Sequence, residues 1–126
     1  MQKTLILIAD DNPLVTQLVS HRLGSRGFEV VTVGDGIQAV AAARSLKPSL
    51  LVLDGMMPGL DGFAVIKTLK EDPETAEIPI LMLSSLKGEK DIVGALTAGA
   101  ADYLVKPFIP EELILRVKRL LGTVAA

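Results

Sequence analysis

Charged and polar side chains follow several apolar segments of this chain at the point where each segment ends. Asp54 closes the apolar run LLVLD and is followed by GMMPGLDG, whose proline and glycines indicate a loop. Asp10 and Asp11 follow a first apolar run, Ser84 ends a fourth, and Lys106 follows a fifth. Carboxylates beside one cation and one hydroxyl suit phosphoryl transfer, because that reaction depends on positioning and charge neutralisation.

Three carboxylates at one site repel one another. A pair of them 4 Å apart costs about 4 kcal/mol at an effective dielectric constant near 20. A divalent cation offsets this repulsion, and an all-oxygen site with few carboxylates suits Mg²⁺, which also binds phosphate. In this interpretation Asp54 is the nucleophile. Lys106 neutralises the phosphoryl group, and Ser84 donates a hydrogen bond to one of its oxygens.

Five apolar runs alternate with segments of helical spacing, and this alternation predicts how the polar residues are positioned. The runs are rich in Leu, Ile and Val without polar alternation, as expected for strands covered on both faces, and they span residues 4–9, 28–33, 49–54, 78–84 and 101–105. Asn12-Pro13 provides a cap and a first-turn proline for the first helix. The pattern predicts a parallel sheet with helices on both faces, whose strands present their carboxyl ends at one edge.

Composition limits the class of protein. The chain has 126 residues, of which 49% are apolar, so we expect one domain over 1–126 with a core over about 3–122. A formal net charge of −2 predicts no direct contact with nucleic acid, and the lack of cysteine excludes disulfides. The apolar runs are too short to span a bilayer and the N-terminus lacks a signal-peptide layout, so we expect a cytoplasmic protein with no membrane partner.

Taken together, these residues resemble the receiver domain of two-component response regulators, the CheY-like family. The resemblance covers essentially the whole chain and is carried by Asp10-Asp11, Asp54 with its loop, Ser84, Tyr103 and Lys106-Pro107-Phe108 in GAADYLVKPF. It implies a flavodoxin-like, doubly wound sheet of five parallel strands in the order 2-1-3-4-5, with five helices on two faces. It also implies that the chain is a bacterial signalling switch rather than an enzyme with turnover of its own.

The resemblance assigns a role to each residue of the site. It implies that a histidine kinase or a histidine phosphotransfer protein phosphorylates Asp54. It implies that Asp11, Asp54 and the backbone carbonyl of Met56 bind Mg²⁺. Asp10 would lie beside these ligands without binding the ion directly. The Lys106-Pro107 peptide bond is expected to be cis.

The same resemblance implies a switch and a surface that reports it. Ser84 would move inward to bond the phosphoryl group, and Tyr103 would follow into the space that Ser84 leaves. The surface is the one formed by residues 88–98, 101–105 and 110–121. On it, Leu115 is the candidate contact, with Asp102 and Arg116 as charged partners. An output domain, a target protein or a second copy of the chain would bind there.

Two positions beside the site are candidates for setting how long the phosphate lasts. Met56 lies two residues after Asp54, and Leu86 lies two residues after Ser84. Our hypothesis is that both side chains shield the phosphoryl group from water. His21 stands alone in a helical segment without other metal ligands nearby in the sequence, so we assign it no metal site.

Two alternative functions remain. Residues Gly34, Gly36 and Ala39 match the dinucleotide-binding pattern G-x-G-x-x-A, and Asp54 lies 20 residues after Gly34. Five strands are too few for both halves of such a domain, and this alternative leaves Lys106 without a role. The other alternative is a receiver-shaped interaction module that works without phosphate, which the complete set of site residues disfavours.

Overall fold

The computed structural model describes residues 4–122, in which five strands form one parallel sheet. The sheet order is β2-β1-β3-β4-β5, as predicted. Register is continuous across the centre, where Leu7 of β1 lies opposite Leu51 of β3. The strands are β1 (Leu5–Ala9), β2 (Glu29–Val33), β3 (Leu50–Asp54), β4 (Ile80–Ser84) and β5 (Asp102–Val105).

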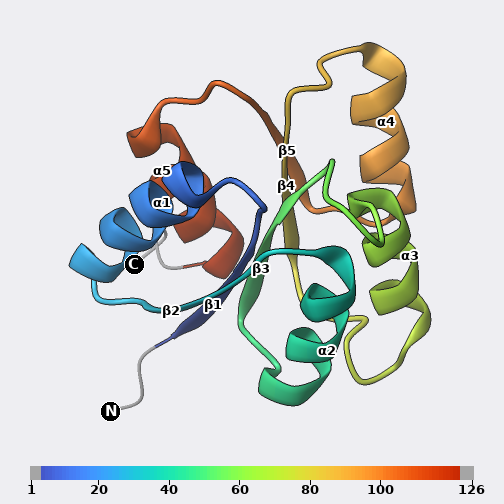
Figure 1. The fold of residues 1–126 in the computed structure, drawn as a ribbon, viewed down its shortest axis with the longest axis horizontal. Coiled ribbons are helices and arrows are strands. Elements are labelled where there is room, and N and C mark those ends of the chain that lie inside the picture. Colours follow the sequence, from blue (N-terminus) through green and yellow to red (C-terminus); the bar gives the residue numbers. More distant parts are fainter. Residues whose placement is uncertain (1–3, 123–126) are drawn as a thin grey trace.

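Five helices alternate with the strands and cover both faces of the sheet. Figure 1 shows α1 and α5 together on one face and α2, α3 and α4 on the other. This arrangement is the predicted flavodoxin-like, doubly wound fold. The helices are α1 (Pro13–Ser25), α2 (Gly36–Leu46), α3 (Gly62–Glu71), α4 (Glu89–Ala98) and α5 (Pro110–Leu121).

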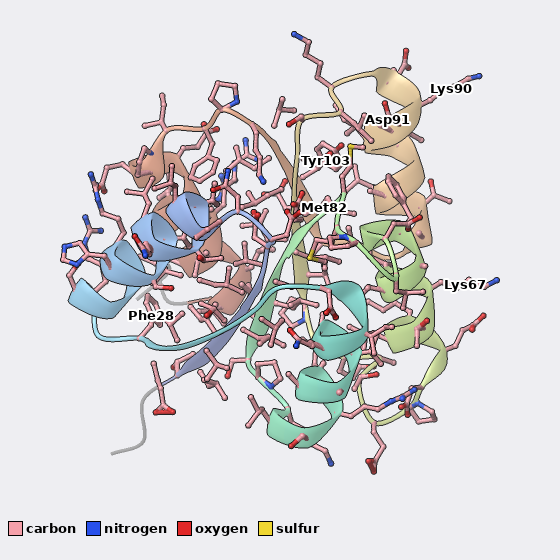
Figure 2. All side chains as sticks on the ribbon, viewed as in Figure 1. Phe28, Lys67, Met82, Lys90, Asp91 and Tyr103 are labelled. Carbon is pink, nitrogen blue, oxygen red and sulfur yellow. The ribbon has the colours of Figure 1, made fainter. Side chains whose placement is uncertain are left out.

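The core lies in two layers, because successive side chains of a strand point to opposite faces of the sheet. Leu51 and Leu53 pack toward α2, α3 and α4, whereas Leu50 and Val52 pack toward α1 and α5. Figure 2 labels residues of both layers, with Phe28 on the α1 side and Met82 and Tyr103 on the other. The central strands are therefore buried on both faces, which explains their uninterrupted apolar sequences.

Local signals fix the segments that lead from strand to helix at the carboxyl edge of the sheet. The side chain of Asn12 accepts a hydrogen bond from the N–H of Leu14 and caps α1, as predicted. Asp61 caps α3 in the same way. The Lys106-Pro107 bond is cis, as the resemblance implied. Among the helices of residues 4–122, none has the length and apolar character needed to cross a membrane.

Candidate functional site

The parallel sheet brings the predicted polar residues to one edge. Asp10 directly follows β1, Asp54 and Ser84 end β3 and β4, and Lys106 directly follows β5. Lys106 Nζ lies 2.8 Å from Asp10 Oδ2 and 3.6 Å from Asp54 Oδ1. Asp10 and Asp54 are buried, at 3% and 6% exposure. One ammonium group therefore bridges two buried carboxylates.

Negative charge exceeds positive charge at this edge. Asp10, Asp11 and Asp54 each offer a carboxylate oxygen, and these three atoms lie within 4.8 Å of one another. Asp11 is exposed, so the cluster opens to solvent on its side. One lysine does not balance three carboxylates, and a hard divalent cation with oxygen ligands fits this set of donors.

The environment of Asp54 sets its protonation. The pKa of the Asp54 carboxyl group is raised from 3.8 to about 6, and burial is the largest cause. The hydrogen bond from the Met56 N–H and the charge of Lys106 lower the pKa, whereas the charges of Asp10 and Asp11 raise it further. The Met56 N–H donates to Asp54 Oδ1 at 3.2 Å. A carboxyl group with this pKa is mostly ionised at neutral pH and carries the negative charge that a nucleophile needs.

Asp10 is held by protein groups at both of its oxygens. Its Oδ1 accepts a hydrogen bond from the Asn12 N–H at 2.9 Å, and its Oδ2 accepts one from Lys106 at 2.8 Å. It is therefore the least available of the three acids to bind a metal directly.

The loop after Asp54 folds back onto the end of its own strand. The N–H of Gly62 donates to the carbonyl of Gly55 at 3.2 Å, closing the loop at its base. A Cβ at Gly62 would lie 2.7 Å from the carbonyl oxygen of Asp54, and one at Gly55 would lie 3.0 Å from Ser84 Oγ. The backbone therefore leaves no room for a side chain at Gly62, whereas a Cβ at Gly55 would fit only if Ser84 shifted slightly.

The two candidate switch residues contact the backbone of the same residue, Leu86. Ser84 Oγ accepts a hydrogen bond from the N–H of Leu86 at 3.1 Å, and the Tyr103 hydroxyl donates to the carbonyl of Leu86 at 2.6 Å. Tyr103 is already buried, at 7% exposure. Sequence analysis singled out Leu86 only for shielding, and no sequence signal indicated that its backbone joins Ser84 to Tyr103.

A pocket of about 450 Å³ adjoins the loop that follows Asp54. Its lining includes Met56, Met57, Phe63 and Leu86. The side chain of Met56 is 58% exposed and Leu86 is half-buried. The two positions proposed to shield a phosphoryl group therefore border one apolar hollow beside Asp54.

The residues proposed for partner contact lie on β5 and α5. Leu115 is 48% exposed. Arg116 bonds Asp102 and Glu112, both at 2.9 Å, so the charged pair proposed from sequence forms within one chain. Burial acts to lower the pKa of Arg116, but the hydrogen bonds and charges of Glu112 and Asp102 outweigh it and raise the pKa. His21 is exposed and lies outside the acidic cluster.

Sequence comparison shows which protein family the chain matches. The profile described as response regulator receiver domain matches residues 6–118. RpaA of Synechocystis sp., named a DNA-binding dual master transcriptional regulator, is 46% identical over 116 residues, which cover 92% of this chain and 48% of RpaA. The chain spans about half the length of the curated relatives it matches. The expectation of no contact with nucleic acid finds no support in these relatives, which are named as DNA-binding proteins.

Solved structures agree with the sequence comparison. The chemotaxis response regulator CheY4 of Vibrio cholerae superposes with a TM-score of 0.88 at 33% identity, over 94% of this chain and 99% of that one. The receiver domain of the sensor histidine kinase PA1611 of Pseudomonas aeruginosa superposes with a TM-score of 0.86 at 32% identity, over 96% and 99%. That structure has a magnesium ion coordinated in its active site cleft. The chain described here belongs to the response regulator receiver domain family of two-component signalling.

Proposed function

We propose that this protein accepts a phosphoryl group on Asp54 from a phosphohistidine of a histidine kinase or a histidine phosphotransfer protein. The observation that carries the proposal is the buried Asp54 carboxylate, which lies 3.6 Å from Lys106 within a cluster of three acids. Family membership supports it, because receivers are signalling switches. As the P–O bond to Asp54 forms, the P–N bond breaks and its electron pair returns to the imidazole of the donor.

The donor set fits Mg²⁺, with Asp11, Asp54 and the carbonyl of Met56 as the proposed ligands. When bound, the ion supplies positive charge to the phosphoryl oxygens. Asp10 holds Lys106 in place at 2.8 Å rather than binding the ion. The PA1611 receiver, with magnesium in its cleft, supports this assignment by analogy.

The residues around Asp54 orient the reaction. Met56 and Lys106 both contact Asp54 Oδ1, so Oδ2 is the oxygen proposed to attack the phosphorus. Lys106 contributes a fixed positive charge, and Ser84 contributes a hydroxyl at the end of the neighbouring strand. Catalysis in this arrangement is mostly positioning and charge neutralisation.

The switch operates through the backbone N–H and carbonyl of Leu86. A phosphoryl group on Asp54 adds about two negative charges and three acceptor oxygens. Ser84 Oγ turns toward these oxygens and releases the N–H of Leu86, and Tyr103, whose hydroxyl bonds the Leu86 carbonyl, follows into the space that Ser84 leaves. A near-complete shift of population needs about 5.5 kcal/mol of differential interaction. Charge-assisted hydrogen bonds from Ser84 and Lys106 supply a large part of that.

The reporting surface is formed by α4, β5 and α5. Tyr103 lies on β5 and reaches the segment that precedes α4, so a movement there alters both elements. Exposed Leu115 and the Asp102–Arg116 pair provide a contact for an output domain, a target protein or a second copy. Relatives about twice as long as this chain favour an output domain as the partner.

The lifetime of the phosphorylated state is proposed to depend on Met56 and Leu86. Both border the apolar hollow beside Asp54 and restrict the approach of water. The variants Met56→Asn and Leu86→Glu should therefore lose phosphate faster than the wild type. Equal rates of loss would remove the shielding role.

The decisive experiment measures intact mass after incubation with a small phosphodonor and Mg²⁺. The wild type should gain one phosphoryl group, whereas Asp54→Asn and wild type without metal should gain none. Asp61→Asn, in the same loop, is the matched control and should be phosphorylated normally. A wild type that gains no phosphoryl group, while a control receiver does, would favour the phosphate-independent interaction module.

A further inference from the structure

The G-x-G-x-x-A segment at the start of α2 has no role in the proposed phosphoryl transfer, yet one of its glycines has no room for a side chain. A Cβ at Gly36 would collide with the carbonyl oxygen of Leu60 and would lie 2.6 Å from the Leu60 carbonyl carbon. A Cβ at Gly34, two residues earlier, would meet nothing within 4 Å. The two glycines of one motif therefore differ sharply in their surroundings.

The first turn of α2 is a firm support for this contact. Asp35 Oδ1 accepts a hydrogen bond from the N–H of Gln38 at 2.7 Å, and Gln38 Oε1 accepts one from the N–H of Gly34 at 3.1 Å. Ala39 is fully buried on the inner side of the same turn. The Asp35 side chain bonds forward to the helix backbone and the Gln38 side chain bonds back to the preceding residues, so the start of the helix is fixed.

Leu60 belongs to the loop that follows Asp54, and this loop is short and closed at its base. Met56 lies in the first half of the loop and Leu60 in the second half, between the closing residues Gly55 and Gly62. Ile37 also reaches the loop, since its Cδ1 would lie 3.7 Å from a Cβ at Gly59. A displacement of Leu60 in so small a loop moves Met56 as well.

We propose that Gly36 is a positioning residue for the loop after Asp54. Because Gly36 lacks a side chain, Leu60 rests directly on α2, and the loop is held where the Met56 N–H donates to Asp54 Oδ1 at 3.2 Å. This proposal rests on the proposed function insofar as Met56 is a ligand of Mg²⁺. It also gives the motif a role other than dinucleotide binding, because the Leu60 carbonyl occupies the place where a pyrophosphate would approach Gly36.

Two alanine variants in the same motif test the proposal. Gly36→Ala should weaken Mg²⁺ binding about tenfold, as loss of a group that positions a metal ligand does elsewhere. Gly34→Ala should leave Mg²⁺ affinity within about twofold of wild type. Titration calorimetry of the metal alone measures both, and amide chemical shifts of Gly55 and Met56 in the metal-free protein report the loop directly. Those shifts should change in Gly36→Ala and not in Gly34→Ala.

A variant destabilised elsewhere separates positioning from loss of stability. Val117→Ala removes buried volume beneath α5, on the other face of the sheet, and should lower the melting temperature while Mg²⁺ affinity stays within about twofold of wild type. If Gly36→Ala does not fold, Ile37→Ala replaces it, because this side chain is 67% exposed. It should weaken Mg²⁺ binding by about twofold to threefold and shift the same amides.

The outcomes distinguish this proposal from the proposed function. A wild type that binds no Mg²⁺ contradicts the metal site, while shifted amides in metal-free Gly36→Ala still support the loop contact. A wild type that binds Mg²⁺, together with a folded Gly36→Ala of equal affinity and unshifted amides, overturns the role of Gly36 and leaves the metal site standing.

Discussion

Two charged clusters of this protein use similar side chains in different surroundings. The edge cluster consists of Asp10, Asp11, Asp54 and Lys106 at the carboxyl ends of the strands. The face cluster consists of Asp102, Glu112 and Arg116 on β5 and α5. In the edge cluster the paired side chains are 1%, 8% and 17% exposed, whereas those of the face cluster are 26% to 41% exposed.

The difference in burial and charge balance decides what each cluster can do. Burial is the largest cause of the raised pKa of Asp54, and its surroundings therefore disfavour the charged form. The pKa of Arg116 is also raised, which for a cation means that the charged form is favoured. The edge cluster therefore gains from an added cation, whereas the face cluster satisfies its own charges. A buried excess of charge is costly unless it is paired, whereas ion pairs at the surface contribute little to stability.

Removing the lysine should produce the largest effect and tests whether the edge cluster depends on it. Lys106→Met leaves Asp10, almost fully buried, without its cation, and should lower the free energy of unfolding by about 3 kcal/mol in metal-free buffer at about pH 8. Urea denaturation measures the change. Lys67→Met, on the exposed face of α3 (Figure 2), is the control and should change stability by about 0.5 kcal/mol or less. Similar values for the two variants would erase the contrast between the clusters.

Neutralising Asp54 should stabilise the metal-free protein. Its pKa is about 6 in the folded state against 3.8 ordinarily, so the folded state binds the proton more tightly than the unfolded state. Stability from this group is present at low pH and is lost as pH rises from about 4 through about 6. At about pH 8, Asp54→Asn should therefore raise the free energy of unfolding by up to about 3 kcal/mol.

The pH dependence provides the check on this second prediction. The gain in stability from Asp54→Asn should shrink toward zero near pH 4. At that pH the carboxyl group of the folded wild type is protonated and therefore uncharged, like the asparagine side chain. Denaturation series at several pH values, all without metal, measure it. A variant that is less stable than the wild type at about pH 8 would show that the fold depends on a charged Asp54, contrary to the direction of its pKa.

Added Mg²⁺ should offset the excess charge of the edge cluster. At a concentration of 100 times its dissociation constant the ion should stabilise the wild type by about 2.7 kcal/mol. Asp11→Asn, at an exposed position, should fold normally and lose most of this gain. Asp61→Asn keeps a good helix cap and should retain it. Thermal unfolding with and without Mg²⁺ gives the values, and an equal gain in Asp11→Asn would exclude Asp11 as a ligand.

The periodicity of the sequence predicted a parallel sheet with the edge cluster at one end of its strands, and the resemblance to receivers supplied the strand order. Uninterrupted apolar runs require strands buried on both faces, and parallel strands place Asp54 and Lys106 at one edge. The start of α1 followed from Asn12-Pro13. These features depend on which residues occur and on their spacing, and on little else.

Features that depend on the path of a loop or on one rotamer were not accessible in this way. The close approach of Leu60 to Gly36 arises because the loop after Asp54 turns back onto α2, and nothing in its sequence specifies that path. The hydrogen bond from Tyr103 to the carbonyl of Leu86 requires a particular side-chain rotamer and backbone orientation. The sequence suggested Tyr103 as a switch, but the partner of its hydroxyl is visible only in the structure.

The smallest effect should come from the face cluster, and it sharpens the comparison most. Arg116→Ala removes both of its ion pairs but leaves two partly exposed carboxylates that water can solvate, so unfolding should become easier by only about 1 kcal/mol or less. In about 1 M salt, where charges are screened within about 3 Å, the difference should shrink further. Urea denaturation at low and high salt measures it, with Arg119→Ala on the same helix as the control. A loss as large as that of Lys106→Met would mean that the face cluster is a fixed part of the core. A small loss would support the proposal that a partner can replace Arg116 on these carboxylates at little cost.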